Sequence, residues 1–153
     1  SGFSGGDVAN PSYDQVTGGG TGHTEAVQVI YDAEVVDYET LLAVYWRNVD
    51  PLDDGGQFCD RGDSYRPAIF AHDDAQQDLA ESIKSDIQER FSNEVVVPIQ
   101  PFEAFYAAED YHQNYYEKNP SHYNRYRQGC RRDARLEELW GEEAGAKHLT
   151  SES

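Results

Sequence analysis

Two Gly-containing stretches of this chain each place an acid beside apolar or aromatic residues. The first is Gly22–Val27, where Glu25 opens an apolar run, and the second is Gly55–Arg66, which holds Asp60 and Tyr65. A carboxyl group that such neighbours shield from water keeps its proton to a higher pH than a solvated one. It can then hold or hand over a proton near neutral pH. The two stretches therefore indicate acid–base chemistry carried by a carboxyl group.

The composition is strongly acidic and limits the classes of partner. The 153 residues carry a net charge of -17, so we expect no nucleic-acid partner, because binding to phosphates depends on Lys and Arg. No apolar run is long enough to span a membrane, and we expect no membrane partner. We expect a cytoplasmic protein, with the periplasm as the alternative, since a sequence that starts at Ser1 would not show a removed targeting signal.

The sequence contains two cysteines and one spacing that could suggest a metal site. Cys59 and Cys130 lie far apart without Cys-x-x-Cys spacing, and could be buried thiols, a single disulfide or redox participants. Glu109 and His112 have the spacing of a di-iron ligand pair, but such a site needs a second copy and further acids, which the sequence lacks. We therefore predict no metal site.

The first third of the chain begins with a loop and continues into regular structure. Residues 1–22 are rich in Gly, Ser, Thr and Pro and predict a loop with a brief ordered piece at 11–16. The β-branched run over 26–31 predicts a buried strand. Asp37 is a suitable N-cap for a helix with one apolar stripe, which Pro51 closes.

The remaining pattern alternates strands and helices, which favours an α/β (α+β) fold. The chain is long enough for one domain, over residues 1–140, followed by a polar tail over 141–153 that we expect to be disordered. After residue 50 the predicted elements are a long loop at 53–63, a strand at 66–72, a helix starting at Asp74, a strand at 94–105, a short helix at 109–118 and a helix at 134–140.

Five motifs, in order, resemble those of peptide-methionine (S)-S-oxide reductases, and the match extends from Ser1 to about Trp140. The resemblance implies a two-layer sandwich with a mixed sheet and packed helices. It also implies reduction of the S-epimer of methionine sulfoxide, free or in oxidised proteins, to methionine. The matching stretches are Gly2–Gly6, Asn10–Tyr13, Gly22–Val27, Gly56–Gly62 and Ala108–Gln113.

The resemblance also implies a role for each matching residue. In this family a cysteine thiolate of a Gly-Cys-Phe-Trp motif attacks the sulfoxide sulfur, while a carboxyl group and tyrosine hydroxyls bind and protonate the oxygen. Glu25 matches the acid, Tyr13 and Tyr65 match the oxygen-binding tyrosines, and Asp60 matches a loop aspartate that organises the site. The alternatives are a surface carboxylate, two packing tyrosines and a loop-capping aspartate.

One departure from the family pattern concerns the nucleophile. The Gly-Cys-Phe-Trp motif precedes the Gly2–Gly6 position in the family, so we expect this sequence to lack its nucleophile, first strand and first helix, and to be inactive as it stands. Phe3 replaces a Tyr that is common in the family. Cys59 stays an uncertain thiol, because Asp60 beside it disfavours a thiolate. Arginines surround Cys130, which is a candidate resolving thiol with an inert thiol as the alternative.

The implied partners are few. We expect no bound cofactor, thioredoxin or a similar dithiol as electron donor, methionine sulfoxide or proteins containing it as substrate, and a monomeric chain. A catalytically silent binding domain is the rival, either retaining the sulfoxide pocket or presenting the cell-adhesion tripeptide at residues 61–63.

Overall fold

The structure, a computed structural model, describes residues 1–146 of the chain. It divides into two compact units: unit 1 comprises Ser1–Ile30 and Pro51–Gln113, and unit 2 comprises Tyr31–Asp50 and Asn114–Ser153. All four candidate site residues, at positions 13, 25, 60 and 65, therefore belong to unit 1. No helix within residues 1–146 is long and apolar enough to cross a membrane.

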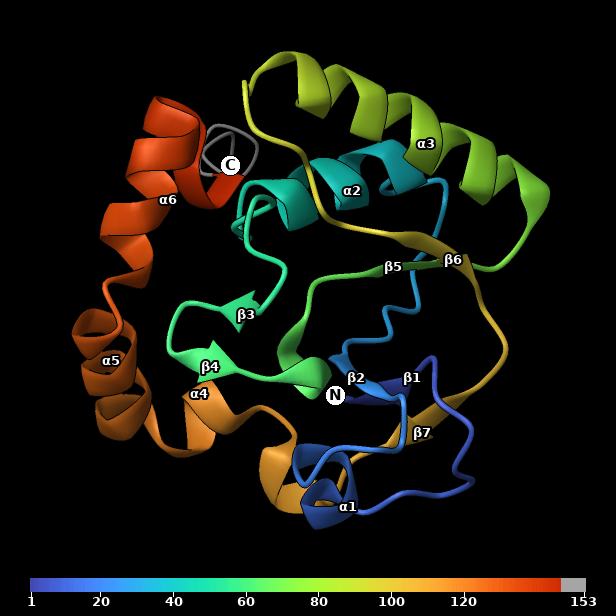
Figure 1. The fold of residues 1–153 in the computed structure, drawn as a ribbon, viewed down its shortest axis with the longest axis vertical. Coiled ribbons are helices and arrows are strands. Elements are labelled where there is room, and N and C mark those ends of the chain that lie inside the picture. Colours follow the sequence, from blue (N-terminus) through green and yellow to red (C-terminus); the bar gives the residue numbers. More distant parts are fainter. Residues whose placement is uncertain (147–153) are drawn as a thin grey trace. The chain divides into compact units, whose positions relative to one another are not determined.

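An antiparallel sheet of three short strands holds the start of the chain in unit 1. Strand β1 (Gly2–Ser4) lies between β2 (Thr24–Ala26) and β7 (Phe105–Ala107) (Figure 1). Phe3 pairs with Glu25 on one side and with Tyr106 on the other. Residues directly opposite each other share a sheet face, so the buried Phe3 ring, 1% exposed, lies beside the Glu25 side chain.

A hairpin occupies the region that the sequence predicted as a long loop. Strand β3 (Gly56–Gln57) pairs with β4 (Asp60–Arg61), and the 3₁₀ turn η1 (Asp63–Tyr65) follows. Gly56 has φ 148°, and a Cβ there would lie 2.1 Å from the carbonyl oxygen of Asp60. Only glycine fits this close approach. The hairpin therefore fixes where Asp60 and Tyr65 enter the site.

The rest of unit 1 consists of a helix on a parallel strand pair and of two short helical turns. Strand β5 (Ile69–Ala71) pairs with β6 (Ile99–Pro101), and α3 (Asp74–Glu89) packs against both (Figure 1). The side chain of Asp73 caps α3 by accepting a hydrogen bond from the backbone N–H of Gln76. The helical turns are α1 (Tyr13–Thr17), which a Ser12–Gln15 capping box begins, and the 3₁₀ turn η2 (Asp110–His112).

The regular elements in the described part of unit 2 are all helices. Its buried side chains include Trp46, Leu136 and Trp140, and the indole N–H of Trp140 donates to the Val49 carbonyl at 3.1 Å. Its elements are α2 (Tyr38–Trp46), α4 (Tyr115–Lys118), α5 (Pro120–Gly129), α6 (Arg132–Trp140) and the 3₁₀ segment η3 (Gly141–Ala146).

The predicted mixed α/β class is confirmed, with strand pairs of both kinds distributed over three small sheets in the described residues. The buried strand predicted over 26–31 is wrong. Strand β2 ends at Ala26, which pairs with Gly2, the first residue of β1. The apolar residues that follow have no partner in β1, and Val27 and Ile30 are 74% and 94% exposed.

Other elements after residue 90 also differ from the sequence-based prediction. The strand predicted over 94–105 is divided between β6 and β7, and the helix predicted over 109–118 between η2 and α4. Helix α5 was not predicted, because it buries no residue and so carries no apolar stripe. Residues 141–146 of the predicted tail form η3, with Ala144 and Ala146 buried, and the remainder of the tail lies outside the described residues.

The hairpin geometry gives a first prediction. Gly56→Ala should lower the free energy of unfolding by about 1–3 kcal/mol, because the new Cβ meets the Asp60 carbonyl and the backbone conformation is strained. Urea unfolding followed by fluorescence measures the change. Gly129→Ala, where a Cβ would meet nothing within 4 Å, is the control and should not destabilise the chain. Equal unfolding midpoints for the two variants would contradict the prediction.

Candidate active site

Four side chains from four separate elements of unit 1 come together. The hydroxyl oxygens of Tyr13 in α1 and Tyr65 in η1 lie 3.5 Å apart. Glu25 in β2 accepts a hydrogen bond from Tyr65, and the negative charge of Asp60 in β4 acts on both Glu25 and Tyr65. We call these four residues the acid–phenol cluster. The structure thus brings together all four residues that the resemblance singled out.

The environment of Glu25 favours its protonated form. Burial, and after it the negative charge of Asp60, raise the pKa of this carboxyl from its ordinary value of 4.5 to about 7, against the opposing effect of the hydrogen bond from Tyr65. Phe3, which lies opposite Glu25 in β1, belongs to a buried cluster with Val16 and Ala108, and Tyr13 packs against the same cluster. A carboxyl with this pKa can donate a proton near neutral pH.

Tyr65 stays a neutral phenol over the whole physiological range. Burial, the hydrogen bond with Tyr13 and the negative charges of Glu25 and Asp60 all raise the pKa of its hydroxyl well above its ordinary value. A neutral phenol both donates and accepts hydrogen bonds. The cluster therefore offers hydroxyl donors beside a protonated acid, an arrangement suited to binding and protonating an acceptor oxygen.

His23 holds the strand that carries Glu25, a role that the sequence analysis missed. The side chain is 2% exposed; its Nδ1 accepts from the Gly6 N–H at 3.1 Å, and its Nε2 contacts the Val8 carbonyl oxygen at 2.7 Å. These two bonds attach the loop after β1 to the start of β2. His23 lies two residues before Glu25 in the Gly22–Val27 motif, and this position could have indicated a role in placing Glu25.

Asp53 organises the hairpin in a way that was also missed. Its carboxylate pairs with the guanidinium of Arg61 through both oxygens, with Nη2 and Oδ1 2.9 Å apart, and Oδ1 also accepts from the Gly55 N–H at 3.0 Å. Arg61 is thus engaged within the hairpin. This weakens the rival hypothesis that residues 61–63 are presented to a receptor, because the arginine of that tripeptide is already paired.

The two cysteines are not free thiols. Cys59 and Cys130 are both disulfide-bonded. Within residues 1–146 no group of three or more His, Cys, Asp or Glu side chains is placed to hold a metal ion.

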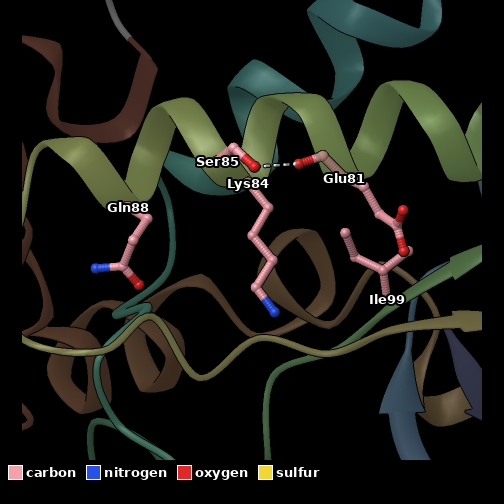
Figure 2. Close-up of a pocket in the computed structure, with 5 residues that line it drawn as sticks. All are labelled: Glu81, Lys84, Ser85, Gln88 and Ile99. Carbon is pink, nitrogen blue, oxygen red and sulfur yellow. Dashed lines mark hydrogen bonds between the residues drawn. The ribbon is translucent and has the colours of Figure 1, made fainter.

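A surface hollow of about 480 Å³ lies along α3 (Figure 2). None of its lining residues belongs to the cluster. We therefore place the candidate active site at Glu25 and not at this hollow. The lining residues are Glu81, Lys84, Ser85, Gln88 and Ile99.

Comparison with known proteins agrees with the geometry. The family model described as peptide methionine sulfoxide reductase matches residues 1–144. The chain belongs to this family. It is 51% identical over 143 residues to peptide methionine sulfoxide reductase MsrA 2 of Staphylococcus aureus strain MW2, covering 92% of this chain and 81% of the relative. MsrA of Bacillus subtilis strain 168 is 49% identical over 143 residues, with the same coverage of both chains.

Solved structures of family members are similar to this one. Reduced Mxr1 from Saccharomyces cerevisiae has a TM-score of 0.75 and 35% identity, over 78% of this chain and 70% of that one. Methionine sulfoxide reductase A of Corynebacterium diphtheriae has a TM-score of 0.68 and 30% identity, over 78% and 62%. The predicted family, enzyme class and reaction, the reduction of methionine sulfoxide in protein repair, are confirmed.

The raised pKa of Glu25 predicts how stability depends on pH. Between about pH 4.5 and about pH 7 the unfolded chain has lost this proton while the folded chain keeps it. Raising the pH through this window therefore favours the unfolded state and lowers the free energy of unfolding. Glu25→Gln removes the titrating group, so the variant should show a shallower fall across the window.

Urea unfolding at pH steps from about 4 to about 8 measures this difference, which follows from proton linkage. Glu94→Gln, a substitution of an exposed glutamate, is the control and should follow the parent chain. The same pH dependence in the parent chain and in Glu25→Gln would show that Glu25 does not titrate differently on folding.

Proposed function

We propose that unit 1 supplies the oxygen-binding and proton-donating groups of a methionine-(S)-sulfoxide reductase. Glu25 protonates the sulfoxide oxygen, the hydroxyls of Tyr13 and Tyr65 bind that oxygen, and Asp60 tunes Glu25. The observation that carries the proposal is the partly buried Glu25 carboxyl, which has a pKa of about 7 and accepts a hydrogen bond from Tyr65, whose hydroxyl lies 3.5 Å from that of Tyr13. A proton donor works best when its pKa is near the working pH.

The proposed reaction needs a thiolate that the family resemblance assigns to a Gly-Cys-Phe-Trp motif ahead of residue 1. The thiolate attacks the sulfoxide sulfur and forms an S–S bond while Glu25 delivers a proton to the oxygen, which leaves as hydroxide when the S–O bond breaks. Hydroxide then adds to the cysteine sulfur as the S–S bond breaks, which leaves a sulfenic acid on the cysteine and releases the thioether. The sulfoxide is thereby reduced to a thioether and the cysteine is oxidised. Tyr13 and Tyr65 support the step by donating hydrogen bonds to the oxygen, where negative charge develops.

The enzyme then requires two electrons to return to its reduced state. A second thiol that attacks the sulfenic acid releases water and leaves a disulfide, which a dithiol reduces by exchange. We propose Cys130 as a candidate for this resolving thiol, once the disulfide that holds it in this structure has been reduced. We propose thioredoxin or a similar dithiol as the electron donor, with no bound cofactor. The four cluster residues all come from unit 1 of one chain, which supports a monomer as the working form.

The present 153-residue chain should be inactive on its own. Incubation with methionine-(S)-sulfoxide and dithiothreitol should give no turnover above buffer, because neither cysteine has the sequence setting of the family's nucleophile. Formation of methionine, separated by chromatography, measures the rate. Turnover comparable to that of a relative with the Gly-Cys-Phe-Trp motif would overturn this expectation, and Cys59→Ser and Cys130→Ser would then identify the thiol responsible.

The proton-donor role is tested in an extended chain, defined as residues 1–153 preceded by the segment encoded upstream. Glu25→Gln should lower kcat by about 10²–10⁴-fold, the usual contribution of a general acid. It should also remove the loss of rate above about pH 7 that deprotonation of Glu25 imposes. Glu94→Gln is the control. An unchanged pH–rate profile in Glu25→Gln would refute the role, and an upstream segment without Gly-Cys-Phe-Trp would favour a silent binding domain.

A further inference from the structure

Glu109 contacts the beginning of helix α1 from a distant part of the sequence. Its Oε1 accepts a hydrogen bond from the backbone N–H of Tyr13 at 3.2 Å, across 96 positions of the chain. Its Oε2 accepts from the hydroxyl of Tyr111 at 3.1 Å. Both oxygens of a single carboxylate are therefore occupied, one by the helix and the other by a neighbouring phenol.

His112 holds the same tyrosine by its ring. The ring centroid of His112 lies 4.4 Å from that of Tyr13 and 4.0 Å from that of Tyr111. Its Nε2 is 3.8 Å from Oε2 of Glu109, which is too long for a hydrogen bond. His112 thus acts on Tyr13 by packing, and the polar contact to Tyr13 comes from Glu109.

The contact from Glu109 satisfies a backbone group that α1 cannot satisfy itself. Tyr13 is the first residue of α1, and the N–H groups of the first turn have no partner within a helix. The Ser12 side chain accepts from the N–H of Gln15 and so leaves that of Tyr13 available. A helix of five residues has little stability of its own, and a carboxylate at its N-terminus is favourable.

We propose that Glu109 is a positioning residue, which fixes the Tyr13 phenol beside Tyr65 by holding the Tyr13 backbone. This inference rests on the proposed function, in which the Tyr13 hydroxyl binds the sulfoxide oxygen. That hydroxyl lies 3.5 Å from the Tyr65 hydroxyl, so a small shift of α1 changes the distance between the two donors. Displacements of about 1 Å in such a site can reduce the rate by about 10²-fold.

Amide hydrogen exchange on the 153-residue chain tests the contact itself. Glu109→Ala should speed the exchange of the Tyr13 amide at least about tenfold relative to the parent, because its acceptor is gone. Glu109→Gln keeps an amide oxygen that can accept from this N–H and should retain most of the protection. Glu103→Ala, at an exposed position just before β7, is the control and should leave the exchange unchanged. Equal exchange rates in parent and Glu109→Ala would overturn the proposal.

A double-mutant cycle in the extended chain tests whether Glu109 acts through Tyr13. Glu109→Ala should lower kcat about 10–100-fold in the parent background. In a Tyr13→Phe background it should cost less than about threefold, because the hydroxyl that it positions is absent. Additive losses would assign Glu109 a general structural role and overturn the proposal. Glu109→Gln, which preserves the backbone contact, should recover most of the rate and guards against a misfolded alanine variant.

The same measurements separate this proposal from the proposed function. Glu109→Ala should keep the pH–rate midpoint near that of the parent, since Glu25 still supplies the proton, whereas Glu25→Gln should lose it. If Tyr13→Phe alone leaves kcat unchanged, the oxygen-binding role of Tyr13 fails, and the positioning role fails with it. If Tyr13→Phe slows the reaction but Glu109→Ala does not, only the positioning role fails.

Discussion

Glu25 in β2 pairs with Phe3 in β1, so its carboxyl lies beside a buried aromatic ring, and the negative charge of Asp60 also acts on that carboxyl. Both effects disfavour the carboxylate, so at neutral pH the folded chain keeps a proton that the unfolded chain would release. This costs folding free energy. Unit 1 must offset that cost with interactions elsewhere, and it must also hold two phenols against the same acid.

The elements that carry the cluster are too short to hold their positions alone. β4 has two residues, η1 three and α1 five, whereas isolated helices and hairpins of this size are marginal in water. Polar contacts between segments take over this task. His23 joins the loop after β1 to β2, Asp53 closes the hairpin around Arg61, and Glu109 holds the start of α1. These polar residues hold the site in place and take no direct part in the proposed reaction.

Local patterns in the sequence predicted what depends on neighbouring residues. Asp37 caps α2 as expected, and the helix predicted to start at Asp74 is α3. The four residues of the acid–phenol cluster were predicted from the family motifs. Local patterns could not have predicted them, because the four residues lie far apart in the sequence. The exposure of Ile30 was missed, since a β-branched run predicts a buried strand only where a partner strand exists. The role of Glu109 was missed because its hydrogen bond spans 96 residues.

The acidic surroundings also affect which groups the cluster can bind. With a net charge of -17, and with Asp60 close to Glu25, the site repels anions, and an ionised Glu25 would add to this repulsion. A sulfoxide is neutral, but its oxygen carries partial negative charge and needs hydrogen-bond donors. Tyr65 stays a donor because its pKa is raised, whereas Glu25 donates only while it keeps its proton. The protonation of Glu25 therefore governs both the binding of the oxygen and the delivery of the proton, so a single titration should control both.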